Sequence, residues 1–190
     1  MFLVIKAFFI SAILIYACQP INLPSRVDFE SETSNKVSIN AKDIITNIKY
    51  DPLFSENNIE DLIINSPIKR LKKLLSDNIL YFGNENLLII DVLDASIIRK
   101  EIENNSENTF EEQIIYHYEI FFKVDFKLLD NNEYLLANAK VETKRSTTSQ
   151  KYISLNDFEI ITNDLISKSL IDFNNETLNQ FKKHMSSYLK

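Results

Sequence analysis

The chain has 190 residues, of which 45% are hydrophobic, so it is long and apolar enough to form one folded domain. Its net charge of −6 argues against a nucleic-acid binder, because such proteins neutralise phosphates with lysine and arginine. The only glycine, Gly83, excludes the phosphate-binding P-loop and the dinucleotide fingerprint, which both need several glycines. The only cysteine, Cys18, excludes an intrachain disulfide and a cysteine-based zinc site. We therefore expect neither a cofactor nor a metal.

The first 17 residues have the layout of a secretory signal peptide. Lys6 is the only charged side chain before Arg26, and an apolar run follows it over residues 7–17. This run is shorter than the roughly 20 apolar residues that cross a bilayer as a helix. The pattern predicts a signal peptide over residues 1–17 rather than a permanent transmembrane anchor.

Cys18 stands directly after this apolar run, in the sequence Ile15-Tyr16-Ala17-Cys18. These four residues resemble the lipobox of bacterial lipoproteins, in which the cysteine is lipidated and becomes the mature N-terminus. The alternative is an uncleaved or conventional signal with an ordinary cysteine, which would leave a lone thiol in an oxidising compartment. The resemblance implies membrane anchoring through acyl chains on Cys18. Because Gln19 rather than aspartate follows the cysteine, it also implies the outer membrane, on the periplasmic side.

Residues 18–36 separate this anchor from the rest of the chain. They are largely polar and contain Pro20 and Pro24, which predicts a lipid anchor followed by a flexible tether. A segment that folds on contact with a partner remains the alternative. We expect residues 37–190 to form a single periplasmic domain.

The first half of this domain contains signals for two strands and one helix. Alternation from Val37 onward predicts a strand over residues 37–50. Ser66-Pro67 is typical of a helix start and predicts a helix over residues 67–78. A β-rich run predicts a second strand over residues 87–98, and residues 99–113 read as an exposed loop. The apolar stripe expected on the helix is Ile68, Leu71, Leu74, Leu75 and Ile79.

The second half contains the clearest pattern of the chain. Residues 114–129 alternate between an apolar and a polar face, which predicts a long strand with one buried side. A turn at residues 130–133 leads to a fourth strand over residues 134–147. A tight hairpin would give four apolar pairs, namely Leu128–Leu135, Phe126–Ala137, Val124–Ala139 and Phe122–Val141.

The C-terminal region reads as a helix that begins at Ser154, with Asp157 placed as in a capping box. Asn174-Asn175 could bend or split this helix. The predicted order is β-α-β-β-β-α, an α+β fold in which two helices pack on one face of a four-stranded antiparallel sheet.

No catalytic constellation is visible in the sequence, so we expect a protein that is not an enzyme. His117 has Glu119 and Lys144 as expected neighbours but no second histidine or cysteine, and His184 suits the end of a helix. Carboxylate pairs such as Asp91 with Asp94 belong to no motif and indicate a solvated surface.

One dense basic run, Lys69-Arg70-Leu71-Lys72-Lys73, stands out in this acidic chain. Its four cations are candidates for a patch that meets lipid phosphates or an acidic partner surface. The alternative is the solvated face of an amphipathic helix.

A lipobox, a short tether, a helix, three consecutive strands and a long final helix together resemble small envelope lipoproteins, among them the LPS-assembly lipoprotein LptE. In that family too, an alternating strand ends in a polar stretch before the last helix, here residues 144–148. The likeness lies in element order over residues 37–190 and carries over no functional residue except Cys18. It implies a protein that sits against an outer-membrane barrel and assists lipopolysaccharide export.

We therefore expect a non-enzymatic outer-membrane lipoprotein that acts as an accessory subunit of an envelope assembly or transport complex. Its partners would be the membrane, through the acyl chains, and an envelope protein such as a barrel, with no nucleic acid. The alternative is a lipid-binding module that holds an apolar ligand between sheet and helices. A deep pocket there favours the alternative, and a filled core favours the accessory role.

Replacing Cys18 with serine removes the thiol to which the acyl chains would attach. We expect Cys18→Ser to lose labelling by a palmitate analogue and to accumulate as a precursor or a soluble periplasmic form. A mature Cys18→Ser protein that still fractionates with the outer membrane would show that lipidation is not its anchor.

Overall fold

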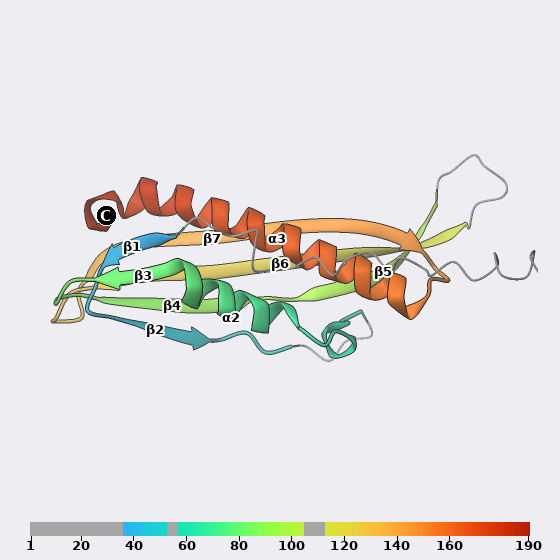
Figure 1. Ribbon diagram of the computed structural model, residues 1–190, viewed down its shortest axis with the longest axis horizontal. Coiled ribbons are helices and arrows are strands. Elements are labelled where there is room, and N and C mark those ends of the chain that lie inside the picture. Colours follow the sequence, from blue (N-terminus) through green and yellow to red (C-terminus); the bar gives the residue numbers. More distant parts are fainter. Residues whose placement is uncertain (1–35, 53–56, 105–112) are drawn as a thin grey trace, which may run out of the picture.

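The computed structural model describes residues 36–52, 57–104 and 113–190. The predicted signal peptide, Cys18 and nearly all of the predicted tether lie outside the described residues. The described chain forms an elongated molecule with two helices and two sheets (Figure 1). Its elements are β1 (Val37–Asn40), β2 (Asp43–Ile48), η2 (Glu60–Leu62), α2 (Pro67–Asn78), β3 (Ile79–Phe82), β4 (Leu87–Asp94), β5 (Ile97–Glu103), β6 (Ile114–Leu129), β7 (Leu135–Gln150), α3 (Leu155–His184) and η3 (Ser186–Tyr188).

The larger sheet is built around β6, the strand with the clearest alternation. β7 pairs with β6 along one edge over almost its whole length. On the other edge, β4 pairs with residues 123–129 and β5 with residues 114–120. The face predicted to be buried is buried, because six side chains of β6 have no exposed surface: Tyr118, Ile120, Phe122, Val124, Phe126 and Leu128.

Helix α3 covers this buried face. Ser154 caps it as predicted, since its Oγ accepts a hydrogen bond from the Asp157 backbone N–H at 3.1 Å. The helix runs for 30 residues without a break, about 45 Å, so Asn174-Asn175 neither bends nor splits it into two helices. Asn174 instead accepts a hydrogen bond from Asn78 of α2, which ties the two helices together.

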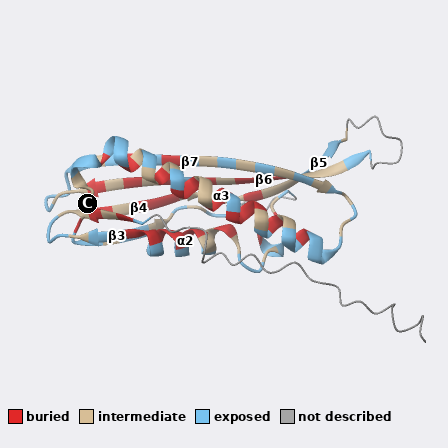
Figure 2. Ribbon diagram, turned by 45° about the horizontal axis from the view of Figure 1, so that its top comes forward, coloured by how far each residue is buried: buried red, intermediate tan, exposed pale blue. Residues whose placement is uncertain are grey.

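Aromatic rings join β6 to α3 at regular intervals. Phe122 packs against Phe173 with ring centres 5.8 Å apart, and Phe126 packs against Phe181 at 4.8 Å, both edge to face. Four residues of strand and eight residues of helix cover nearly the same length, about 13 Å and about 12 Å. The two spacings therefore match, and buried residues of α3 and of the strands beneath it belong to one hydrophobic core (Figure 2).

The α+β class is confirmed, but the predicted sheet is wrong in strand number and direction. The larger sheet has five strands rather than four, and β1 and β3 form a second sheet. The predicted strand over residues 37–50 is two strands, because the chain crosses between the sheets at Ala41-Lys42, whose N–H groups bond to Phe82 and Asn86. β1 runs parallel to β3 and β2 runs parallel to β4, since helix α2 supplies the crossover that parallel pairing needs.

Two further segments differ from the prediction. Ile79 begins the four-residue strand β3 directly after α2 instead of extending the helix stripe. The predicted loop over residues 99–113 begins too early, because Arg99 to Glu103 belong to β5. The sequence pattern missed β3 because this strand is short, and it missed the end of β5 because that end is charged and largely exposed. The single strand predicted over residues 87–98 is also wrong, since it consists of β4 and the start of β5.

The β6–β7 hairpin has a longer turn than predicted. Leu128 pairs with Ala137 rather than with Leu135, and the other three predicted pairs shift by the same two residues. The cause is the Asp130 side chain, which accepts a hydrogen bond from the Tyr134 N–H at 2.8 Å and closes a wider loop. A shift of two residues keeps each side chain on its face of the sheet, so the predicted core remains right.

None of the helices in the described part of the chain is long and apolar enough to cross a membrane.

Ala139 tests the packing between β7 and α3, because its side chain is 2% exposed and it pairs with Phe126. Ala139→Phe should lower the free energy of unfolding by about 1–3 kcal/mol through overpacking. Lys140→Ala, on the opposite and exposed face, should change it by less than about 0.5 kcal/mol. Urea unfolding measures both values, and equal losses would contradict the assignment of the two faces.

Candidate functional site

Helix α2 presents three lysines to solvent. Its apolar stripe, Leu71, Leu74 and Leu75, is buried as predicted. Lys69, Lys72 and Lys73 are exposed, and their spacing of three and four residues places them on one side of the helix. We call these three residues the lysine face.

Arg70 does not belong to this face, although the sequence grouped it with the lysines. Its guanidinium turns toward α3, where Nη2 donates to Ser167 Oγ at 2.6 Å and Nη1 donates to Asn163 Oδ1 at 3.3 Å. Arg70 therefore joins the two helices, and the remaining patch consists of lysines alone.

The position of the lysine face does not serve the stability of α2. Lys69 lies in the first turn, where the helix dipole disfavours a cation, and this turn contains no acidic residue. Ser66 occupies the N-cap position, but its side chain makes no capping hydrogen bond. Neighbouring like charges such as Lys69 and Lys72 also repel each other on a helix surface. Lys69 is thus placed where it costs helix stability.

A hollow of about 460 Å³ opens on the other side of α2, between this helix and the edge of the large sheet. We call it the α2–β2 groove. Its walls and floor come from four elements and are mainly apolar: Ile44 and Thr46 of β2, Leu75 of α2, Ile79 and Tyr81 of β3, and Ile90 of β4. No sequence signal indicated this groove, because it depends on the separation of β1 and β2 into different sheets.

Asp91 forms a buried ionic cluster on the sheet face that points away from the helices. Its carboxylate accepts hydrogen bonds from Lys49 Nζ and Lys127 Nζ, both at 2.8 Å, and from Asn47 Nδ2 at 3.0 Å. The residue is 2% exposed, so the expectation of a solvated carboxylate is wrong for Asp91. Burial raises the pKa of Asp91, but the three hydrogen bonds outweigh burial and hold this pKa well below its usual range. The cluster ties the edge strand β2 to β4 and β6.

A second buried carboxylate, Glu60, lies in η2. The Tyr50 hydroxyl donates a hydrogen bond to Glu60 Oε1, and Asn58 Nδ2 donates a second one to the same oxygen at 3.5 Å. Burial raises the pKa of Glu60. The pKa of Tyr50 is raised by burial and, in addition, by the neighbouring Glu60 carboxylate. The group contains no nucleophile beyond the tyrosine hydroxyl, and its contacts hold the segment after β2 in place.

Of the predicted neighbours of His117, Glu119 is confirmed, because its carboxylate lies 3.7 Å from His117 Nε2. Lys144 contacts Glu119 at 2.5 Å, but across the hairpin it pairs with Phe121, whereas His117 pairs with Thr148. His184 ends α3, as expected for a histidine near a helix C-terminus. Among residues 36–52, 57–104 and 113–190, no three histidine, cysteine, aspartate or glutamate side chains gather in a way that could hold a metal ion. Cys18, the predicted lipidation site, lies outside the described residues.

Asp91→Asn should lower the free energy of unfolding by about 2–3 kcal/mol at pH 7, because it weakens two charge-assisted hydrogen bonds. The pKa of Asp91 is lower in the folded than in the unfolded chain, so its contribution is complete above the ordinary aspartate value near pH 4. The difference in the free energy of unfolding between wild type and Asp91→Asn should therefore shrink as the pH falls below about 4.

The matched control is Glu142→Gln, which removes an exposed carboxylate from an ion pair with Lys123 on the same sheet face. The free energy of unfolding of this variant should be lower than that of wild type by about 0.5 kcal/mol or less. Urea unfolding over a pH series measures both variants, and a pH-independent loss in Asp91→Asn would contradict the ionic account.

Solved structures similar to this chain include two bacterial lipoproteins. A minor lipoprotein from Acinetobacter baumannii is 12% identical with a TM-score of 0.40, and the match covers 75% of this chain and 91% of that one. Rare lipoprotein B from Shewanella oneidensis is also 12% identical with a TM-score of 0.38, covering 74% and 96%. No protein-family model and no curated protein matches the sequence. At these identities and TM-scores neither neighbour assigns a function to this chain.

Proposed function

We propose that this protein is a non-enzymatic lipoprotein, anchored in the outer membrane through acyl chains on Cys18, that serves as an accessory subunit of an envelope assembly or transport complex. The observation that carries the proposal is the lysine face of α2. It is exposed, it belongs to an acidic chain, and its first residue, Lys69, lies where the helix dipole disfavours a cation. Such a surface fits an anionic partner.

The sequence before the domain supports the anchored part of the proposal. The apolar run ends directly at Cys18, in a context that resembles a lipobox. Acyl chains on this cysteine would hold the domain at the membrane without a transmembrane helix. The periplasmic domain would then meet its partner by diffusion within a short distance of the membrane surface.

Electrostatics supports the docking part. The chain has a net charge of −6, so an acidic partner would approach it at a local cluster of cations, and the lysine face is such a cluster. Complementary charge of this kind fixes orientation and speeds association more than it adds affinity. Added salt should therefore weaken the association.

The α2–β2 groove favours a second candidate, a lipid-binding module. Its volume of about 460 Å³ lies in the range of small-ligand pockets, and most of its lining is apolar. Aromatic rings such as Phe122 and Phe173 pack between α3 and the sheet, so we expect a ligand in the open groove beside α2 rather than beneath α3. We rank this function second for that reason.

Charge reversal on α2 tests the first candidate. In Lys69→Glu/Lys72→Glu, the new acidic groups lie near the helix N-terminus, so stability should stay level or rise by about 0.3–1 kcal/mol. Binding to the anionic partner should fall. The measurement is the set of proteins that co-purify with the full-length protein from detergent-solubilised outer membranes, identified by mass spectrometry.

The control is Lys182→Glu/Lys183→Glu at the exposed end of α3, which changes the net charge by the same amount away from the lysine face. It should keep the partner that the α2 variant loses. Equal recovery from both variants would contradict docking through α2. A lipid co-purifying at the same level from wild type and both variants, with no protein partner, would favour the lipid-binding module instead.

A further inference from the structure

The α2–β2 groove is bordered by two strand edges. Within the described residues, β2 pairs only with β4, and β3 pairs only with β1. Ile44 and Thr46 of β2 and Ile79 and Tyr81 of β3 line the groove from either side. The side of β2 away from β4 carries no ladder hydrogen bonds to any described strand. Such an edge is a template for one more strand.

Two of the apolar side chains that line the groove, Leu80 and Tyr81, are exposed. Leu80 is 42% exposed and Tyr81 is 54% exposed, although both belong to a strand beside the groove. A floor of apolar side chains between edges rich in backbone donors and acceptors suits an extended peptide. An acyl chain would fill the floor but would leave the N–H and C=O groups of the edges without partners.

The chain itself supplies a segment with the matching pattern. Apolar residues stand at alternate positions before β1, at Ile21, Leu23, Val27 and Phe29, with polar residues such as Asp28 between the last two. Spacing by two places apolar side chains on one side of an extended chain. The strongest stretch is residues 26–30, Arg-Val-Asp-Phe-Glu.

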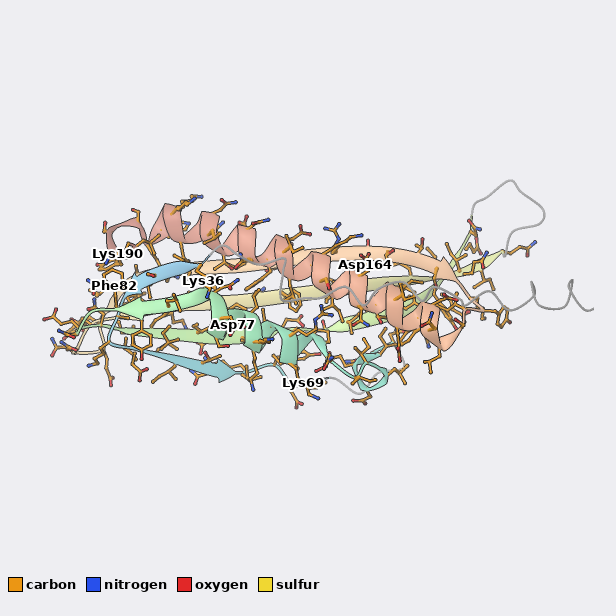
Figure 3. All side chains as sticks on the ribbon, in the orientation of Figure 1. Lys36, Lys69, Asp77, Phe82, Asp164 and Lys190 are labelled. Atoms are coloured by element: carbon orange, nitrogen blue, oxygen red, sulfur yellow. The ribbon has the colours of Figure 1, made fainter. Side chains whose placement is uncertain are left out.

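This segment enters the described structure next to the groove. Val37, the first residue of β1, pairs with Ile79, which lines the groove. Figure 3 labels Lys36, which directly precedes β1, and Asp77, which directly precedes the last residue of α2. Phe29 precedes Val37 by eight residues, and eight residues of extended chain reach about 26 Å. The groove lies within that reach.

We propose that residues 26–30 of the same chain dock in the α2–β2 groove as an added strand, with Val27 and Phe29 facing its apolar floor. Docking shortens the link between anchor and domain. From Cys18 to Val37 the extended chain spans about 63 Å, whereas from Cys18 to Val27 it spans about 30 Å. The docked form therefore holds α2, which also carries the lysine face, close to the membrane.

Photo-crosslinking of the full-length protein, extracted from membranes in detergent, tests this docking. A benzoylphenylalanine in place of Phe29 should crosslink within one chain to peptides from β2, α2 or β3. The same probe at Asp28 should give much less of this product, because in an added strand its side chain points away from the floor. Equal yields at the two positions overturn the proposal.

A variant that fills the α2–β2 groove provides a second test of the docking. Thr46 is exposed, so Thr46→Trp should leave the fold intact by circular dichroism and remove the crosslink from position 29. If Thr46→Trp fails to fold, Ser76→Trp replaces it, since Ser76 also lines the groove and is exposed. A crosslink that forms between two copies, that forms only to lipid, or that survives filling of the groove overturns the proposal. The crosslinking experiment does not require a partner protein, so its outcome does not depend on the function proposed above.

Discussion

The contact between β6 and α3 determines where the other elements of the domain can lie. β6 places its buried aromatic side chains at intervals that match those of α3, so a 16-residue strand and a 30-residue helix pack along nearly their whole common length. The residues of this interface belong to one buried hydrophobic core. The α2–β2 groove lies outside this interface, beside α2 and the edge strand β2.

The arrangement around α2 follows from the way β6 is paired. β7 occupies one edge of β6, and β4 and β5 share the other, so β2 can join only at the outside of β4. The chain reaches β2 from β1, which belongs to another sheet, and returns to β4 through α2 and β3. This detour separates the two sheets and leaves the apolar groove between them. The Asp91 cluster compensates for the exposed position of β2 by tying it to β4 and β6.

Local patterns predicted the elements whose own residues determine them. Period-two alternation located β6 to the residue, and Ser66-Pro67 and Ser154 located the starts of both helices. Features that depend on contacts with residues far away in the sequence were not predicted. They are the crossing of the chain between the sheets at Ala41-Lys42, the parallel direction of β2 and the orientation of the Arg70 side chain. The hairpin register failed for a local reason, since Asp130 closes a wider turn than the shortest one. In the candidate basic patch, the three lysines are exposed as predicted, whereas Arg70 bridges α2 and α3.

The account assigns docking to α2, on an acidic domain that would be held near the membrane by Cys18. The most direct measurement places a photo-reactive amino acid at Lys72 on the lysine face and, separately, at Lys140 on the opposite side of the sheet, in living cells. The account predicts that Lys72 gives an adduct with one defined envelope partner and that Lys140 gives none. Adducts of equal yield from the two positions, or an adduct from Lys140 alone, would contradict it.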